Sequence, residues 1–116
     1  MGALNELAKR IYEFNVSMGW HNSEPDLSKY LMNLHSEISE LWESWRNNNH
    51  QGPCDKADRM ANMGLTPLTC IEEELADIVI RALDTAATYG VDIDNAVATK
   101  MAYNATRGHR YGGKRA

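Results

Sequence analysis

Two stretches of the chain carry the same acidic spacing: Glu37-Ile38-Ser39-Glu40 and Glu74-Leu75-Ala76-Asp77. In each stretch two carboxylates stand three positions apart, inside a segment whose apolar residues recur at helical spacing. Residues that are three apart in an α-helix lie on the same face, about one turn from each other. The two stretches therefore predict two amphipathic helices, each of which presents a pair of carboxylates.

Apolar stripes define these two helices. The first stripe consists of Leu27, Leu31, Leu34, Ile38, Leu41 and Trp45, and the second of Ile71, Leu75, Ile78, Ala82 and Leu83. On the first helix Glu37 and Glu40 share one flank of the stripe, while Glu43 falls on the opposite side. On the second helix Glu74 lies almost inside the stripe, so we expect its carboxyl to be poorly solvated.

These four carboxylates predict a site for a hard divalent cation. Crowded, poorly solvated carboxylates repel one another, and they either take up protons or bind cations. No Cys or His stands at a matching spacing, and an oxygen-only donor set favours Mg²⁺, or Mn²⁺ as a substitute, over Zn²⁺. The predicted metal ligands are Glu37, Glu40, Glu74 and Asp77. The alternative is that they are ordinary exposed acids, which is the usual situation for a single pair.

The remaining pattern predicts two more helices. One contains Leu4, Leu7, Ile11 and Phe14 and ends near Gly19. The helix with the first acidic pair should run from about Asp26 to Arg46, with Asp26 or Ser28 as its cap. The helix with the second pair should be capped by Thr66 or Thr69, carry Pro67 in its first turn, and run to Tyr89 before Gly90. Asp92 or Asp94 should cap a last helix that reaches Gly108.

We expect an all-α, four-helix bundle formed by residues 1–116 as a single domain. Residues 47–69 form a long irregular connection in which only a weak helical turn, near Lys56 to Arg59, is indicated. The basic tail from about residue 108 to residue 116 should be flexible. Because the stripes are broad and the domain is small, a homodimer or homotetramer is expected.

Composition excludes several classes of protein. The net charge is −4 and the pI is near 5.5, which argue against stable nucleic-acid binding. No apolar run reaches the roughly 18 residues of a membrane span, and no N-terminal signal segment is evident. We therefore expect a cytoplasmic protein without membrane contacts, in which Cys54 and Cys70 are free thiols.

Two further groups of residues are candidates for substrate binding. Lys100, Asn104 and Arg107 are spaced four and three apart and would line one face of the last helix. Such donors suit a polyphosphate whose remaining charge is offset by a bound cation, although a solvated helix end would show the same pattern. Trp20 and His21, in the connection after the first helix, could stack on and hydrogen-bond a planar base, or simply cover the end of the core.

Taken together, the motifs resemble a known family. Glu37-x-x-Glu40, Glu74-x-x-Asp77 and Lys100-x-x-x-Asn104-x-x-Arg107 are similar in order and spacing to the signature of the MazG-like all-α nucleoside triphosphate pyrophosphohydrolases. The resemblance extends from about Leu4 to Arg110. It includes the residues that flank the second acidic pair and residues 89–93. The long connection from residue 47 to residue 69 departs from the family pattern.

The resemblance implies a specific activity. It implies Mg²⁺-dependent hydrolysis of a nucleoside triphosphate to the monophosphate and pyrophosphate, for housecleaning of the nucleotide pool, by an α-helical dimer or dimer of dimers. Glu37, Glu40, Glu74 and Asp77 would hold the metal, and Glu37 or Glu40 would accept the proton of the attacking water. Lys100, Asn104 and Arg107 would hold phosphates, the last two either within the chain or across a subunit interface. Glu73 adjoins the second motif and would support the ligands without being one.

Two alternatives stay open at this level. Phosphoribosyl-ATP pyrophosphatase shares the fold and the carboxylate arrangement, and would act on phosphoribosyl-ATP rather than ordinary nucleotides. A non-catalytic helical dimer that binds nucleotide or protein would show no metal-dependent turnover. A ferritin-like di-iron protein is disfavoured, because no His follows a Glu at Glu-x-x-His spacing.

Overall fold

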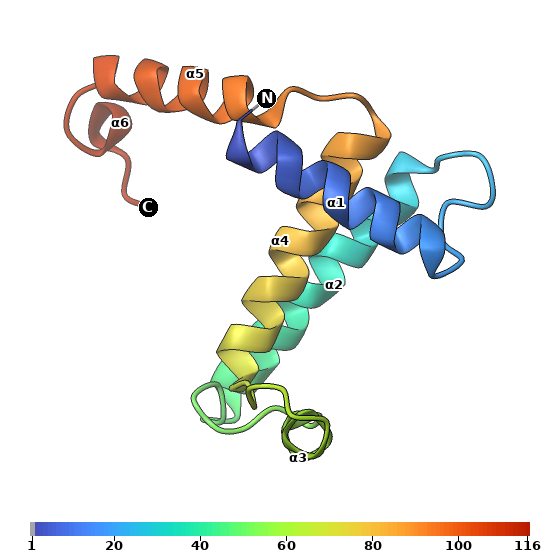
Figure 1. The fold of residues 1–116 in the computed structure, drawn as a ribbon. Coiled ribbons are helices and arrows are strands. Elements are labelled where there is room, and N and C mark those ends of the chain that lie inside the picture. Colours follow the sequence, from blue (N-terminus) through green and yellow to red (C-terminus); the bar gives the residue numbers. More distant parts are fainter. Residues whose placement is uncertain (1) are drawn as a thin grey trace.

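The computed structural model describes residues 2–116, and these residues form helices joined by loops (Figure 1). The helices are α1 (Ala3–Ser17), α2 (Leu27–Arg46), α3 (Ala57–Asn62), α4 (Cys70–Thr88), α5 (Ile93–Thr106) and α6 (Arg110–Gly113). Within residues 2–116 there is no strand, apart from one isolated bridge between Pro53 and Thr69. The expected all-α class is confirmed. None of these helices combines the length and apolar character that a membrane span needs.

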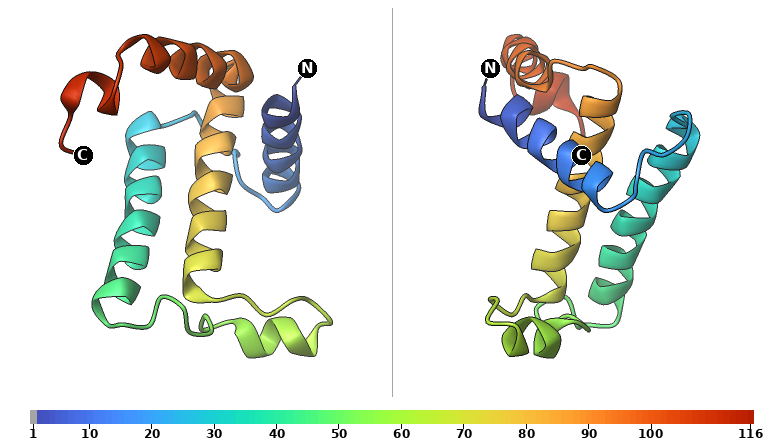
Figure 2. Two further views of the ribbon diagram at one scale, coloured as in Figure 1. Left: turned by 90° about the vertical axis from the view of Figure 1, so that its left-hand side faces the viewer. Right: turned by 45° about the vertical axis from the view of Figure 1, so that its right-hand side comes forward.

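The centre of the fold is an antiparallel pair, α2 and α4, with α1 packed across the second half of α4 (Figures 1 and 2). The chain descends along α2, passes through the loop that contains α3, and returns along α4. The two helices that carry the acidic pairs are therefore direct neighbours. This places the two predicted carboxylate pairs on facing elements.

Side-chain caps show where three of the predicted helices begin. Asp26 caps α2, because its carboxylate accepts from the backbone N–H of Lys29 at 3.2 Å. Thr69 and Glu72 form a reciprocal capping box at the start of α4. Asp92 caps α5 by accepting from the backbone N–H of Asn95. Thr66 is therefore not the cap of α4, and Pro67 lies before the helix rather than in its first turn.

Two short helices add to the four that were predicted. α3 occupies part of the segment that was expected to be irregular, at the place where the weak helical turn was indicated. α6 lies in the basic tail, and its backbone is left-handed at Tyr111 (φ 54°) and Gly112 (φ 93°), so it is a turn rather than a continuation of α5. The sequence signal at both places was weak because each helix is too short to show an apolar period.

α5 does not pack beside α2 and α4 as the fourth member of a bundle. It contacts α1 and α6, and it extends away from the α2–α4 pair (Figures 1 and 2). The radius of gyration is 16.9 Å, compared with about 13 Å for a compact domain of this length. In a single chain the expected four-helix bundle is therefore three packed helices and a projecting arm.

The core of a single chain is thin. The buried apolar residues among those described are Ala8, Cys54, Ala57, Leu83 and Ala86. All three tryptophans are more than half exposed, at 66% for Trp20, 53% for Trp42 and 61% for Trp45. Exposed apolar surface of this extent in a folded chain commonly marks a surface that a partner covers.

A network of side-chain caps joins the start of α5 to the start of α1. The Asp94 carboxylate accepts from the backbone N–H groups of Leu4 (3.1 Å) and Asn5 (2.9 Å). In return, the Asn5 side chain donates to Asp92 and accepts from the backbone N–H of Ile93, both at 2.9 Å. Each side chain thus satisfies the free N–H groups of the other helix. The joint explains why α5 leaves the fold at this point.

We predict that Asp94→Ala and Asn5→Ala each lower the free energy of unfolding by about 1–2 kcal/mol, because each leaves helix N–H groups without an acceptor. The double variant should lose less than the sum of the two, since both side chains act in one joint. Thermal unfolding followed by circular dichroism measures this. Asp58→Ala, at an exposed position of α3, is the control and should change stability by less than about 0.5 kcal/mol. Full additivity would contradict a shared joint.

Candidate metal and phosphate site

One face of α4 carries four charged residues at helical spacing: Glu74, Asp77, Arg81 and Asp84. The steps of three, four and three keep these side chains on one side of the helix. This side faces α2 and the connection between α1 and α2, as contacts of Arg81 with Glu37 and of Asp84 with His21 demonstrate. The face is therefore the wall of a site rather than a solvated surface.

Three of the four predicted ligands converge between α2 and α4. Carboxylate oxygens of Glu37, Glu74 and Asp77 all lie within 4.8 Å of one another. Glu37 is buried, and one oxygen of Glu74, Oε2, is buried with no hydrogen-bond partner among the described residues. An unpaired buried carboxylate oxygen is costly unless it is protonated or bound by a cation. The donor set and the unpaired oxygen both fit a hard divalent cation.

Electrostatics divide the cluster into protonated and ionised members. Burial and the neighbouring carboxylates of Glu37 and Glu40 raise the pKa of Glu74 to about 8. Burial also tends to raise the pKa of Glu37, but the Arg81 guanidinium and the neighbouring carboxyls outweigh burial and lower it. Burial and the negative charge of Glu37 raise the pKa of Asp77. The cluster thus retains a proton at Glu74 where an isolated carboxyl would have lost it.

Glu40 and Glu73 stand at the margin of the cluster. Glu40 is exposed and is not one of the three convergent carboxylates, although burial and the charge of Glu37 raise its pKa. Glu73 is buried, and its Oε1 accepts from the Lys56 ammonium at 2.6 Å. Glu73 is therefore neutralised by Lys56, from the loop that was expected to be irregular, and points to a different partner from Glu74.

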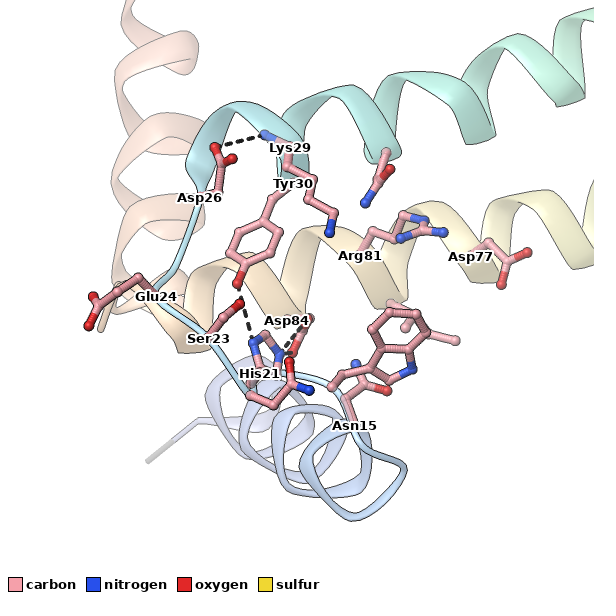
Figure 3. A pocket seen from close by; sticks show the side chains of 14 residues that line it. Asn15, His21, Ser23, Glu24, Asp26, Lys29, Tyr30, Asp77, Arg81 and Asp84 are labelled. Carbon is pink, nitrogen blue, oxygen red and sulfur yellow. Dashed lines mark hydrogen bonds and ion pairs between the residues drawn. The ribbon is translucent and has the colours of Figure 1, made fainter.

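A cavity of about 730 Å³ shares Asp77 with the cluster, and Figure 3 shows the side chains that line it. Asp77 and Arg81 line it from α4, Lys29 and Asn33 line it from α2, and the connection from Trp20 to Glu24 closes another side. Figure 3 shows the labelled Arg81 and Asp77 on the same stretch of the α4 ribbon. The volume lies in the range of pockets that hold small-molecule ligands. The cavity thus combines a carboxylate edge, two cationic side chains and an aromatic residue.

Trp20 and His21 both line this cavity, but in different ways. The His21 side chain is only 7% exposed, its Nε2 lies 2.9 Å from both Asp84 oxygens, and its Nδ1 lies 3.4 Å from the Tyr30 hydroxyl. The ring also stacks on Tyr12 with centroids 4.6 Å apart. Both ring nitrogens are therefore engaged within the protein, and the backbone of His21 is held at a φ of 60°. Trp20 is the residue whose aromatic ring remains exposed to a ligand.

The three phosphate-binding candidates are not brought to the acidic cluster of the same chain. Lys100 and Arg107 lie over the ring of Tyr103, and Arg107 also lies over Tyr111. Asn104 accepts from Arg107 at 3.3 Å. The predicted helix to Gly108 is shorter than expected: α5 ends at Thr106, and Arg107 is the residue that follows it. All three residues belong to the projecting arm and do not line the cavity.

Three charged residues that line the cavity were not predicted from the sequence: Arg81, Asp84 and Lys29. The Arg81 Nε donates to Glu37 Oε1 at 2.8 Å, across 44 positions of sequence. A signal for the first two was present, because both continue the spacing of Glu74 and Asp77 along the same face of α4. No local pattern marks Lys29 as part of the cavity.

Comparison of the chain with protein families, curated proteins and solved structures gives no match. The site is therefore interpreted from its own geometry and chemistry. Both cysteines are free, and the buried Cys54 lies in a separate group with Asp55 and Glu73, whose carboxylates are both paired with Lys56.

We predict that the stability of the cation-free protein depends on Glu74. Because folding raises the pKa of Glu74 from 4.5 to about 8, the folded chain keeps a proton that the unfolded chain releases, and the free energy of unfolding falls between these pH values. Glu74→Gln removes this fall. In EDTA at pH 8 its melting temperature should exceed that of the wild type by at least about 4 °C, or ~1 kcal/mol, with little difference at pH 4.5.

Glu43→Gln is the matched control, since Glu43 is exposed and only weakly paired with Arg46 at 3.9 Å. It should leave the melting temperature unchanged at both pH values. Equal melting temperatures of the wild type and Glu74→Gln at pH 8 would contradict a raised pKa of Glu74 in the folded protein.

Proposed function

We propose that the protein is a Mg²⁺-dependent nucleotide pyrophosphohydrolase that converts a nucleoside triphosphate, ribo or deoxy, to the monophosphate and pyrophosphate. The observation that carries the proposal is the convergence of Glu37, Glu74 and Asp77, with an unpaired buried oxygen on Glu74. Asp77 of this cluster also lines a cavity of ligand size. The motif resemblance points the same way. Nucleotide-pool housecleaning is the corresponding physiological role.

The carboxylates would hold the metal. Glu37, Glu74 and Asp77 provide oxygens close enough to share one cation, and Glu40, one turn along α2, would complete the predicted set. Bound Mg²⁺ supplies charge that offsets the phosphates and activates water for attack. With Mn²⁺ the same oxygen donors would serve.

The protein's own residues would do the remaining work. Glu40 is accessible to solvent beside the cluster, and partial desolvation of its carboxyl together with the charge of Glu37 raises its pKa. A raised pKa suits a group that accepts a proton from water. Glu37 is less suited to that role, because Arg81 holds one of its oxygens. Lys29 and Arg81 line the cavity and would contact phosphate oxygens. Trp20 would stack on the base while the Asp84–His21 pair holds the connection that carries it.

We predict that Asp77→Asn and Glu40→Gln abolish pyrophosphate release while the helical circular dichroism is retained, because each keeps the side-chain shape and removes a charge from the cluster. The assay uses a panel of dNTPs, NTPs, modified nucleotides and phosphoribosyl-ATP, with Mg²⁺ and with EDTA. Glu43→Gln, on the same helix, should remain active. Metal-independent release, or wild-type turnover by Asp77→Asn, would overturn the metal assignment.

The proposal includes a second copy of the chain. The thin core and the exposed tryptophans favour a partner that covers apolar surface. The charge is complementary as well: residues 100–116 hold five of the 12 Lys and Arg and no acid, whereas all 16 acidic residues lie before them. A homodimer or homotetramer in which the α5 arm of one copy reaches the acidic cluster of another would unite the phosphate donors with the metal ligands.

We predict that two impaired variants complement each other. Asp77→Asn lacks a metal ligand, and Arg107→Ala lacks a phosphate donor and should mainly raise KM. In a mixed dimer, a site with intact acids would receive an intact Arg107 from the Asp77→Asn copy, so co-expression should restore a site with wild-type KM. If Arg107 acts within its own chain, the mixture will show only the raised KM of Arg107→Ala.

A further inference from the structure

The carboxylate of Glu37 takes part in two arrangements, an ion pair with Arg81 and the acidic cluster. Glu37 Oε1 accepts from Arg81 Nε at 2.8 Å, and the same side chain belongs to the cluster with Glu74 and Asp77. Glu37 is 9% exposed as a side chain, so it cannot turn to solvent. A guanidinium and a divalent cation at one buried carboxylate repel each other, and they compete for the same oxygens.

Arg81 has freedom that Glu37 lacks. Its side chain is 41% exposed, and it lines the cavity together with Lys29. The contact with Glu37 uses Nε, and neither Nη group makes a hydrogen bond to another residue within 2–116. The fork of an arginine binds phosphate oxygens in pairs, and the four N–H donors of the two Nη groups are available for this.

We propose that Arg81 is an exchangeable counter-ion. When no divalent cation is bound, Arg81 neutralises Glu37. When the cation is bound, Arg81 leaves Glu37 and binds the phosphates of the substrate instead. The inference rests on the proposed function, because it takes the cluster to be a cation site. Arg81 then opposes cation binding in the absence of nucleotide and favours nucleotide binding in the presence of the cation. Cation and nucleotide binding would then be coupled through one side chain.

A purely structural ion pair predicts something different. If Arg81 only holds α2 against α4, its removal loosens the cluster and weakens the binding of both ligands. The exchange predicts opposite signs for the two. The two effects are therefore separated by measuring the ligands independently.

The test uses Arg81→Gln, with Arg81→Lys as the variant that keeps the charge. Mn²⁺ affinity is measured without nucleotide by calorimetry, and the affinity for inorganic tripolyphosphate is measured in saturating Mg²⁺. Arg81→Gln should bind Mn²⁺ about fivefold to tenfold more tightly and tripolyphosphate about tenfold more weakly, a change of ~1.4 kcal/mol for each factor of ten. Arg81→Lys should bind Mn²⁺ like the wild type and tripolyphosphate with intermediate affinity.

Arg46→Gln is the matched control, because Arg46 is an exposed arginine at the end of α2 whose contacts are with Glu43 and the Trp42 ring, outside the cavity. It should alter neither affinity. Circular dichroism melts establish that each variant is folded. Unchanged or weaker Mn²⁺ binding by folded Arg81→Gln, while the wild type binds Mn²⁺, would overturn the exchange and leave the proposed function standing. A wild type that binds no Mn²⁺ would overturn both.

Discussion

The structure depends on the close approach of α2 and α4, which brings Glu37 within 4.8 Å of Glu74 and Asp77. Like charges this near repel one another in a partly buried site. The repulsion is reduced by the raised pKa of Glu74, which keeps its proton, and by the Arg81 guanidinium, which pairs with Glu37. A divalent cation could replace both. The same concentration of negative charge lies next to the cationic side chains of Lys29 and Arg81, which line the cavity.

The cavity wall is fixed by a second buried pair. Asp84 lies three positions beyond Arg81 on α4 and holds His21, whose ring is also stacked on Tyr12. One face of α4 therefore carries Glu74 and Asp77 of the acidic cluster, Arg81, and the Asp84 that holds the connection with Trp20. This arrangement explains how an irregular connection can form a wall: its strained backbone at His21 is compensated by contacts with three helices.

The arm formed by α5 shows what a single chain leaves incomplete. Its start is fixed to α1 by Asp94 and Asn5, yet Lys100, Asn104 and Arg107 lie away from the acids that they would complement. The same chain exposes Trp42 and Trp45 and buries few apolar residues. The basic arm, the acidic body and the uncovered apolar surface are the features on which the proposed association of chains rests.

The sequence by itself determined the four long helices, most of their ends and the acidic pairs on α2 and α4, because these follow from the 3.6-residue period and from local caps such as Asp26 and Thr69. It also indicated that Glu74 would be poorly solvated, which its buried Oε2 confirms. Only the tertiary structure decided that Arg81 meets Glu37, that His21 is engaged by Asp84, and that α5 projects. These contacts join residues dozens of positions apart, and their distances are set by packing between helices, which no local period encodes.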